Sequence, residues 1–377
     1  MEVFYGNNDK QINITNKIPK NETYYLPNNN NILDKLFGDP LPNIIKSIYI
    51  NNIEYRIDIY INITENKIYT KNTLPNIYPI TFSIPEEKIV SFVPYKDKQL
   101  SDLIPGKQST YIYNTEETYY DEYKRSYFAI TMKKAGWDCM RHYEIMANGC
   151  IPVFDNIKEC PKNTMALLPK HLIIEGNELY KKINETNNGS QNTFLQNIIQ
   201  KEECNVLIQK HLKYLRDNLT TKKIAEYILV KTKYQSAQKI LFLSGHLFSD
   251  YLRCLTLHGF KELIGQNCHD YPKVPHLYKG HDIEQCKMWG KGFTYNGLLD
   301  NSLHNDELDK TIEEDIKNKK YDIIMYGSMH RGLPLYELCT KYYNPNEIII
   351  LCGEDAHNCC YEQFVLKGNH VFLREMY

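Results

Sequence analysis

Residues 127–156, which read YFAITMKKAGWDCMRHYEIMANGCIPVFDN, constrain the fold of this 377-residue chain more than any other segment. Tyr127–Met132 is a short apolar run with aromatic and β-branched members, which predicts a buried strand. A glycine-containing loop follows, and Asp138 suits the N-cap of a helix that runs to about Asn148. Gly149 suits the position after the helix, and the next apolar run predicts a second strand. The segment therefore predicts a strand–loop–helix–strand unit of an α/β fold.

Charged side chains gather at the start of this predicted helix. Arg141 and Glu144 lie three residues apart and share one helical face, and Lys133 and Lys134 precede the helix. A helix N-terminus offers free N–H groups and a partial positive charge, which together with these cations favour a diphosphate. Glu144, one turn further in, can accept hydrogen bonds from a ribose diol. The predicted ligand-binding residues are Lys133, Lys134, Gly136, Asp138, Arg141 and Glu144.

The alternative is an ordinary α/β unit with solvated charges, because a single glycine loop is a weak signal. A resemblance favours the ligand. Gly136-Trp137-Asp138, Arg141-His142-Tyr143-Glu144 and Gly149-Cys150-Ile151-Pro152-Val153 resemble the nucleotide-sugar-binding half of exostosin-like glycosyltransferases. The likeness is specific over these thirty residues and looser from Tyr78 to Thr232. It implies a two-Rossmann (GT-B) architecture, with Arg141 on the donor diphosphate and Glu144 on the ribose. Trp137-Asp138-Cys139 replaces the Ser-rich turn of typical exostosins, so the donor sugar does not carry over.

Composition narrows the class of partner. The net charge is −1 and charged residues make up 24%, which favours neither nucleic acid nor an anionic membrane. The chain contains no apolar run of transmembrane length, and its first residues lack an apolar signal core. Eleven cysteines without a CxxC pair indicate reduced thiols. These features predict a soluble cytoplasmic protein, and the Asn-, Ile-, Lys- and Tyr-rich composition is typical of AT-rich coding, as in giant DNA viruses.

Residues 1–72 predict a small β module. Ser47–Ile50 and Ile53–Tyr60 flank Asn51-Asn52, a plausible hairpin turn. The sequence of this region contains no group of residues with the pattern of a catalytic site. It is interpreted as a packing or oligomerisation appendage, and carbohydrate binding is the alternative.

Residues 73–235 form the predicted donor-binding Rossmann-like domain. Besides the unit above, the pattern predicts strands at Ile80–Ile84 and Lys88–Val93, and a strand or strand end at Leu172–Glu175. Helices are expected at Glu116–Arg125, Glu178–Ile183, Glu202–Tyr214 and Thr221–Val230.

Residues 236–377 predict a second Rossmann-like domain. Lys239–Leu243, Asp322–Tyr326 and Glu347–Leu351 are expected strands, and Asp250–Phe260 is an expected helix. Parallel sheets bind ligands at the carboxyl ends of their strands. Polar side chains that follow these strand ends predict a site there: His246, Asp250, Ser328, His330, Glu354, Asp355 and His357.

This half also resembles a known pattern. Asp250–Gly259, Asp270–Lys273, Gly290–Thr294 and the strand that ends in Arg374-Glu375 resemble the N-terminal half of certain glycosyltransferase-like proteins. In those proteins this half precedes the donor-binding half, whereas here it follows. We interpret the chain as a circularly permuted two-domain enzyme, which surface termini tolerate. The alternative is one segment of a longer tandem or mis-split product.

These inferences predict an inverting glycosyltransferase that moves a sugar from a UDP- or GDP-sugar to a hydroxyl of a glycan or protein-linked acceptor. Arg141, with Lys133 or Lys134, would stabilise the departing diphosphate. Asp250, His246 and Glu354 compete as the general base, and their positions favour Asp250 or His246. No Asp-x-Asp stands at a strand end, so no obligatory metal is expected.

Three other classes remain open. A non-catalytic glycan- or nucleotide-binding protein would keep the ligand site without a competent base. A metal-dependent hydrolase would use Glu354, Asp355, His357 and His330 as ligands. A structural virion component would not need cations at one helix N-terminus.

Overall fold

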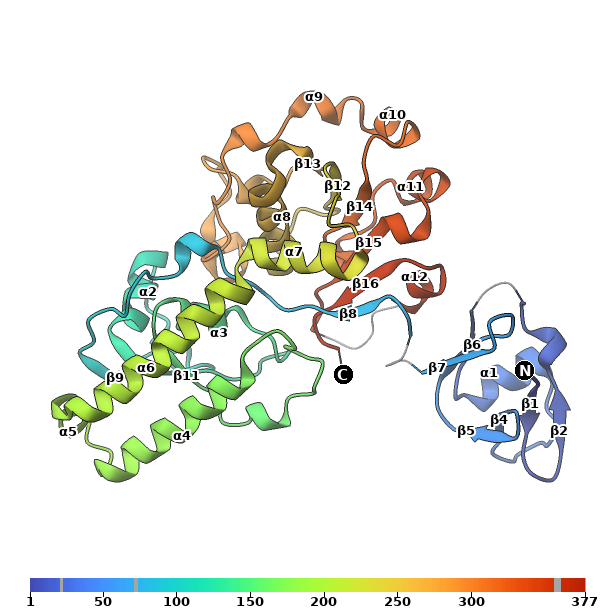
Figure 1. Ribbon diagram of the computed structural model, residues 1–377, viewed down its shortest axis with the longest axis horizontal. Coiled ribbons are helices and arrows are strands. Elements are labelled where there is room, and N and C mark those ends of the chain that lie inside the picture. The colour runs from blue at the N-terminus through green and yellow to red at the C-terminus, as the bar shows by residue number, and fades with distance from the viewer. Residues whose placement is uncertain (21–22, 71–73, 356–360, 377) are drawn as a thin grey trace. The chain divides into compact units, whose positions relative to one another are not determined.

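The computed structural model describes residues 1–20, 23–70, 74–355 and 361–376 (Figure 1). The chain divides into two compact units, Met1–Ile77 with Cys360–His370 and Tyr78–Cys359 with Val371–Tyr377. Each unit has a hydrophobic core of its own. The boundary that the sequence predicts between residues 72 and 73 lies outside the described residues.

The first unit is mainly antiparallel β structure. Its two sheets have the strand orders β2-β1-β4-β5 and β3-β6-β7. Asn51 and Asn52 have φ of 47° and 69°, and Ile50 pairs with Ile53. The hairpin turn predicted at these asparagines is therefore confirmed, although the predicted strand 53–60 is two strands. The elements are β1 (Val3–Gly6), β2 (Gln11–Asn13), β3 (Tyr24–Leu26), α1 (Asn30–Phe37), β4 (Ser47–Ile50), β5 (Ile53–Tyr55), β6 (Ile59–Asn62), β7 (Lys67–Thr70) and α12 (Glu362–Leu366).

The second unit contains a three-stranded parallel sheet of order β11-β10-β9, in which Phe128 pairs with Ile151. One helix connects β10 to β11 and is buried along its whole length. These three elements form the strand–loop–helix–strand arrangement that the sequence predicts. The elements are β9 (Lys98–Leu100), α2 (Glu116–Lys124), β10 (Ser126–Ile130), α3 (Met140–Ala147), β11 (Ile151–Val153), α4 (Lys170–Thr186), α5 (Gln191–Gln196), α6 (Ile198–Tyr214) and α7 (Thr221–Thr232).

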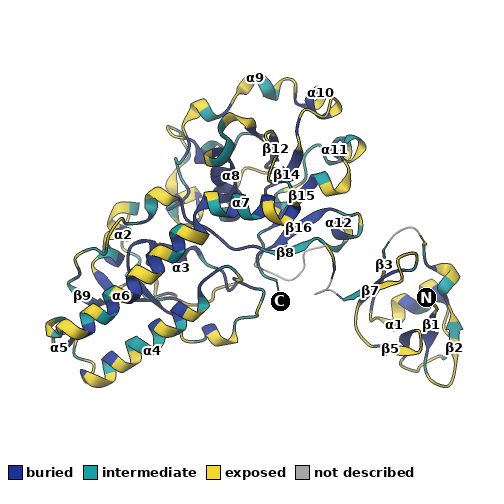
Figure 2. Ribbon diagram, in the orientation of Figure 1, coloured by how far each residue is buried: buried dark blue, intermediate teal, exposed yellow. Residues whose placement is uncertain are grey.

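Three strands predicted for this region are wrong. The segments 80–84 and 88–93 are not strands, because their backbone groups bond singly to scattered partners: Ile80 N to Leu373 O and Ile84 N to Leu219 O. Residues 172–175 lie inside α4 rather than in a strand. Their short apolar run forms part of an amphipathic helix, and Figure 2 shows α4 with exposed residues along its length between buried ones.

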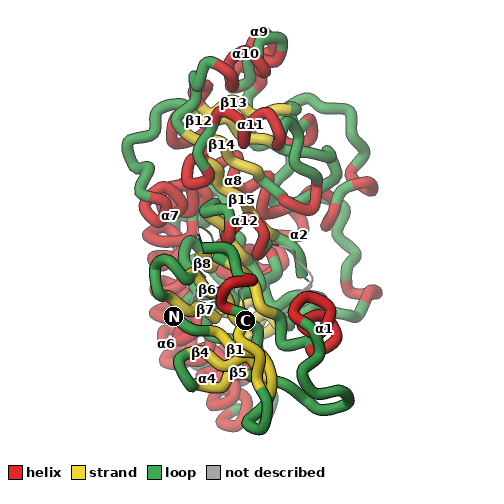
Figure 3. The backbone as a smooth tube through the Cα atoms, turned by 90° about the vertical axis from the view of Figure 1, so that its right-hand side faces the viewer, coloured by secondary structure: helices red, strands yellow, loops and turns green. Residues whose placement is uncertain are grey.

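A six-stranded sheet of order β13-β12-β14-β15-β16-β8 forms the other layer of the second unit. The strands β13, β12, β14 and β15 are parallel neighbours (Figure 3, strands in yellow). Their residues are buried almost throughout. The elements are β8 (Ile77–Pro79), β12 (Ile240–Leu243), α8 (Tyr251–Ile264), β13 (Cys268–Tyr271), α9 (Asp306–Asp309), α10 (Ile312–Lys317), β14 (Ile323–Tyr326), α11 (Tyr336–Tyr342), β15 (Ile348–Cys352) and β16 (His370–Leu373).

The fold is thus α/β with parallel sheets, as predicted. Among the described residues, every helix is too short or too polar to cross a membrane.

Candidate functional site

A pocket of about 500 Å³ lies in the second unit at the carboxyl ends of both parallel sheets. The loops that follow β10, β12, β14, β15 and β16 line it, together with the first turns of α3 and α8. Sheets of this kind bind ligands at such a position, where loops can vary without disturbing the core. Of the polar side chains that the sequence places after the strand ends, Asp250, Glu354 and Asp355 line this pocket, whereas His246, Ser328 and His330 do not.

The lining combines aromatic and charged side chains. Its aromatic residues are Phe82, Tyr111, Tyr113, Tyr119, Tyr251, Trp289 and Phe293. Its cationic residues are Lys134, Arg141, Lys291, Arg331 and Arg374. Its acidic residues are Asp138, Glu144, Asp250, Glu354 and Asp355. Some of these side chains already make hydrogen bonds within the protein and hold the pocket walls in place. The others keep hydrogen-bonding groups that are available to a ligand.

Arg141 is a buried cation that makes no ion pair with any described residue. The residue is 9% exposed, and its Nε and Nη1 atoms make no hydrogen bond to any described residue. The centroid of the Tyr111 ring lies 5.8 Å from Cζ of Arg141. A buried guanidinium normally has its donors satisfied, because leaving them unpaired costs several kcal/mol. Arg141 is therefore positioned to receive an anion from the pocket.

The N-terminus of α3 is open on the pocket side. Asp138 is not the N-cap that the sequence predicts: the N-cap is Cys139, whose side chain makes no capping hydrogen bond. Asp138 instead turns toward the core, where its carboxylate accepts hydrogen bonds from Phe82 N and Tyr143 Oη, both at 2.8 Å. The aspartate is used for packing, so the first turn of α3 keeps N–H groups for a ligand.

Burial raises the pKa of Asp138 to about 6, although the nearby Arg374 guanidinium opposes this shift. The folded protein then binds the proton more tightly than the unfolded chain, whose Asp pKa is about 3.9. This group therefore lowers the free energy of unfolding by on the order of 2–3 kcal/mol as pH rises from about 4 to about 6. Asp138→Asn should lose this decline, which urea unfolding at pH values below and above this window measures. An identical pH dependence in both proteins would contradict the assignment.

Glu144 lines the pocket but is already held. Its Oε1 atom accepts a hydrogen bond from Thr294 Oγ1 at 2.6 Å, and its Oε2 atom accepts one from Tyr119 Oη at 2.8 Å. Burial raises the pKa of this carboxyl group. Each carboxylate oxygen has a second lone pair, so Glu144 can still accept a bond from a ligand hydroxyl.

The loop before α3 differs from a phosphate-binding glycine turn. A Cβ atom on Gly136 would lie 2.5 Å from Glu375 Oε1 and 2.7 Å from Asp355 Oδ1, so this glycine is closely packed against carboxylate groups of the protein. Lys134 lines the pocket, whereas Lys133 does not and has its Nζ 4.9 Å from the centroid of the Trp137 ring. Of the two predicted lysines, only Lys134 is placed for a pocket ligand.

The three candidate bases differ in their surroundings. Asp250 caps α8 through a 3.0 Å bond from Arg253 N to Oδ1, and its Oδ2 atom is 3.3 Å from Arg331 Nε. His246 is exposed and does not line the pocket. Glu354 lines the pocket, is partly buried, and makes no hydrogen bond or ion pair with another residue of the described part of the chain. Glu354 is therefore the pocket carboxylate that is free to accept a proton from a ligand.

Sequence reasoning left Arg374 out of the site, although it noted that the last strand ends in Arg374-Glu375. The residue is 1% exposed. Its guanidinium donates to Gly353 O at 2.8 Å, to Asp138 O at 2.6 Å and to the Asp355 carboxylate. Arg374 thus joins the end of β16 to the loop after β15 and to the loop before α3. A strand-end arginine carries no local signal for such distant partners.

The loop 288–295 forms a second part of the lining that was missed. Gly290, Lys291 and Gly292 all have φ between 55° and 77°. Such a run of left-handed residues is uncommon and is often found at ligand sites. Lys291 Nζ donates to Tyr113 O at 2.8 Å, so the loop is tied to the opposite wall. The two glycines at 290 and 292 were the available sequence signal.

The alternative of a metal-dependent hydrolase receives no support from the described residues. The groups with metal-ligand spacing in the described part of the chain do not include Glu354, Asp355 or His330, and His330 Nε2 lies 3.3 Å from Cys352 Sγ. His357 lies outside the described residues.

Comparison of the chain with family models, with curated proteins and with solved structures finds no match in any of the three.

Proposed function

We propose that the protein is a glycosyltransferase that uses a nucleotide-diphosphate sugar. The observation that carries this proposal is Arg141, a buried guanidinium that lines the pocket and has two nitrogens without a partner among the described residues. It lies in the first turn of α3, which has no side-chain cap. A diphosphate satisfies both the guanidinium and the helix N–H groups, through charge-assisted hydrogen bonds of about 1.5–3 kcal/mol each. Lys134 adds a third positive group at the same end.

The aromatic lining supports the nucleoside and sugar parts of such a donor. Tyr111 lies beside Arg141, and Trp289 at the pocket is 63% exposed, so aromatic faces are available for stacking on a base or a sugar ring. The spare acceptor capacity of Glu144 suits a ribose hydroxyl, as the exostosin resemblance implies.

Glu354 is the general base in this proposal. An acceptor hydroxyl attacks the anomeric carbon, its proton passes to the Glu354 carboxylate, and the bond to the diphosphate breaks with inversion. Arg141 and the α3 N-terminus stabilise the negative charge that develops on the departing diphosphate. Asp250, which the sequence favoured, holds the start of α8 and the side chain of Arg331.

The domain arrangement is part of the proposal. We assign the three-stranded and six-stranded layers to the two halves of a GT-B enzyme with permuted order. Support comes from the pocket lining, which the loops of both sheets supply.

Glu354→Gln should reduce turnover by about 10²–10⁴-fold, because the amide cannot accept the proton, while donor affinity stays within about threefold. Release of nucleoside diphosphate from a UDP- or GDP-sugar, with and without acceptor, measures this effect. Asp250→Asn is the matched control, since asparagine is also a good N-cap and keeps α8 intact. Full turnover in Glu354→Gln together with loss in Asp250→Asn would transfer the role of base to Asp250.

A non-catalytic nucleotide-binding protein is the other outcome of this assay. Wild-type protein would then bind the nucleotide with Arg141 but release no product from any donor, and Glu354→Gln would change nothing.

A further inference from the structure

A second cluster of chemically active side chains lies away from the pocket, where α9 approaches β13 (Figure 1). His304, Asp306 and Asp309 each bring one potential ligand atom into a common space. None of these residues lines the pocket described above. His269 and Asp270 on β13 lie directly behind them.

His304 is the central residue of this cluster. Its side chain is fully buried, and its Nε2 atom lies 3.4 Å from Asp306 Oδ1 and 3.4 Å from Asp309 Oδ2. Despite these distances, Nε2 makes no hydrogen bond to any described residue. A neutral ring directs a lone pair toward two carboxylates, an arrangement that a cation bound between them would stabilise. Ligand atoms around a tetrahedral zinc ion lie about 3.4 Å apart, given bonds of about 2.1 Å.

The outer contacts of His304 are those of a metal ligand. Its Nδ1–H donates to Asp270 Oδ1 at 3.0 Å, which fixes the tautomer that leaves Nε2 free to bind a metal. Asp270 is itself held by Lys261 Nζ and by Tyr278 Oη, both at 2.8 Å. A carboxylate behind a histidine is the usual support for a bound metal, because it orients the ring and raises its basicity.

Asp309 is supported in the same way. Its Oδ1 atom accepts a hydrogen bond from His269 Nε2 at 2.8 Å, while Oδ2 faces His304. The rings of His269 and His304 stack with centroids 5.2 Å apart. Asp309 is thereby held with one oxygen directed to the common space, and Asp306, 83% exposed, closes it from the solvent side.

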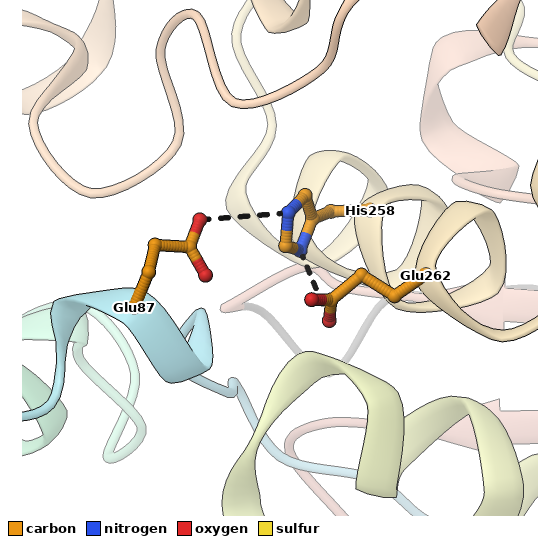
Figure 4. Close-up of side chains that lie close together, drawn as sticks. All are labelled: Glu87, His258 and Glu262. Atoms are coloured by element: carbon orange, nitrogen blue, oxygen red, sulfur yellow. Dashed lines mark ion pairs between the residues drawn. The ribbon is translucent and has the colours of Figure 1, made fainter.

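The other group with metal-ligand spacing, Glu87, His258 and Glu262, has a different geometry. Figure 4 shows the His258 ring between the two carboxylates, with Glu87 facing Nε2 and Glu262 facing Nδ1. Thr221 Oγ1 also lies 2.9 Å from Nδ1. The two carboxylates face different ring nitrogens, and burial lowers the pKa of His258. The group therefore lacks the single free ring nitrogen, facing two carboxylates, that the His304 cluster presents.

We infer that His304, Asp306 and Asp309 bind one divalent transition-metal ion, with zinc the preferred ion and water in the remaining position. Imidazole with carboxylates suits zinc better than calcium or magnesium, which prefer oxygen ligands alone. The ion pins the segment that contains α9 to β13, because its ligands come from that segment and their supports come from the strand. This inference does not depend on the proposed transferase activity.

The test uses the full chain, stripped with a chelator, dialysed against ZnCl₂ and analysed for bound metal by elemental analysis and calorimetry. Wild-type protein should bind one zinc ion per chain and gain thermal stability from it. Asp306→Asn should lose the ion without loss of fold, since this side chain is exposed and has no other partner than His304 in the described part of the chain. Asp270→Asn should weaken zinc binding about 10–100-fold.

Glu307→Gln is the matched control, because it alters the next acidic residue, which is also exposed and pairs with Lys310 instead. It should bind zinc as wild type does. Absence of zinc from wild-type protein would overturn the inference and leave a protonated His304 between the carboxylates. Equal zinc binding in Asp306→Asn would also overturn it, since the ion would then be held elsewhere, for example by cysteine thiols.

Discussion

Arg141→Met is expected to weaken the binding of UDP or GDP at least about 100-fold while the free energy of unfolding changes by less than about 1 kcal/mol. The guanidinium has no ion pair to lose within the described part of the chain, and two of its donors are unpaired, so the apo protein gains little from its charge. In the nucleotide complex, by contrast, the substitution would remove two charge-assisted hydrogen bonds from the guanidinium to the diphosphate, worth on the order of 3–5 kcal/mol together. Calorimetry with each nucleotide and urea unfolding of the apo protein measure the two quantities.

Lys133→Met is the control for this variant. Lys133 is also a cation of the loop before α3, but its ammonium group lies over Trp137 and the residue does not line the pocket. It should keep nucleotide affinity within about threefold. Unchanged nucleotide affinity in Arg141→Met would show that Arg141 does not bind the diphosphate. Unfolding of that variant would show that Arg141 instead stabilises the folded core.

Arg374→Met is expected to destabilise the protein by about 3–5 kcal/mol. The substitution removes the donors to Gly353 O and Asp138 O, and it leaves the Glu375 carboxylate, 3% exposed, without its cation. Breaking a buried ion pair from one side costs this much because the remaining charge stays desolvated. Thermal unfolding should show a loss of on the order of 10 °C in Tm.

Arg125→Met provides the comparison for Arg374. Arg125 also binds a carboxylate through two nitrogens, with Nη2 2.6 Å from Asp97 Oδ2, but its side chain is 54% exposed. An exposed pair contributes less than about 1 kcal/mol, so this variant should unfold near the wild-type temperature. Equal losses in the two variants would show that burial does not set the contribution of Arg374.

The sequence predicted the α/β class and the unit around α3 because those features are local. A strand, a helix and their turn depend on neighbours a few residues apart, and Gly149, with φ of 65°, ends α3 as expected. The hairpin at Asn51 and Asn52 is local for the same reason. Local patterns were insufficient for residues 172–175, since a short apolar run is compatible with either a strand or one face of a helix.

The site was predicted only in part, because its selection depends on contacts between distant residues. Arg141, Glu144 and Glu354 all line the pocket. Their free hydrogen-bonding capacity depends on distant contacts: Thr294 and Tyr119 bind Glu144, whereas Glu354 has no partner among the described residues. Asp138 resembled an N-cap in the sequence, and its bond to Phe82 N across 56 residues could not be read from local spacing.

The helices α3 and α8 both begin at the pocket. Their N-termini differ in whether they can bind an anionic ligand. Asp250 caps α8 with its own carboxylate, so that end is already occupied by a negative group. The first turn of α3 has no side-chain cap and no acidic residue, and Arg141 lies within it. An anionic ligand is therefore expected at α3 and not at α8.

A thermal-shift screen of nucleotide sugars against the 377-residue chain tests the central proposal most directly. We predict that at least one UDP- or GDP-sugar raises the Tm of wild-type protein in a concentration-dependent manner, and that Arg141→Met abolishes this rise. If no nucleotide sugar shifts the Tm, or if the shift persists in Arg141→Met, the pocket is not a donor site for a nucleotide-diphosphate sugar.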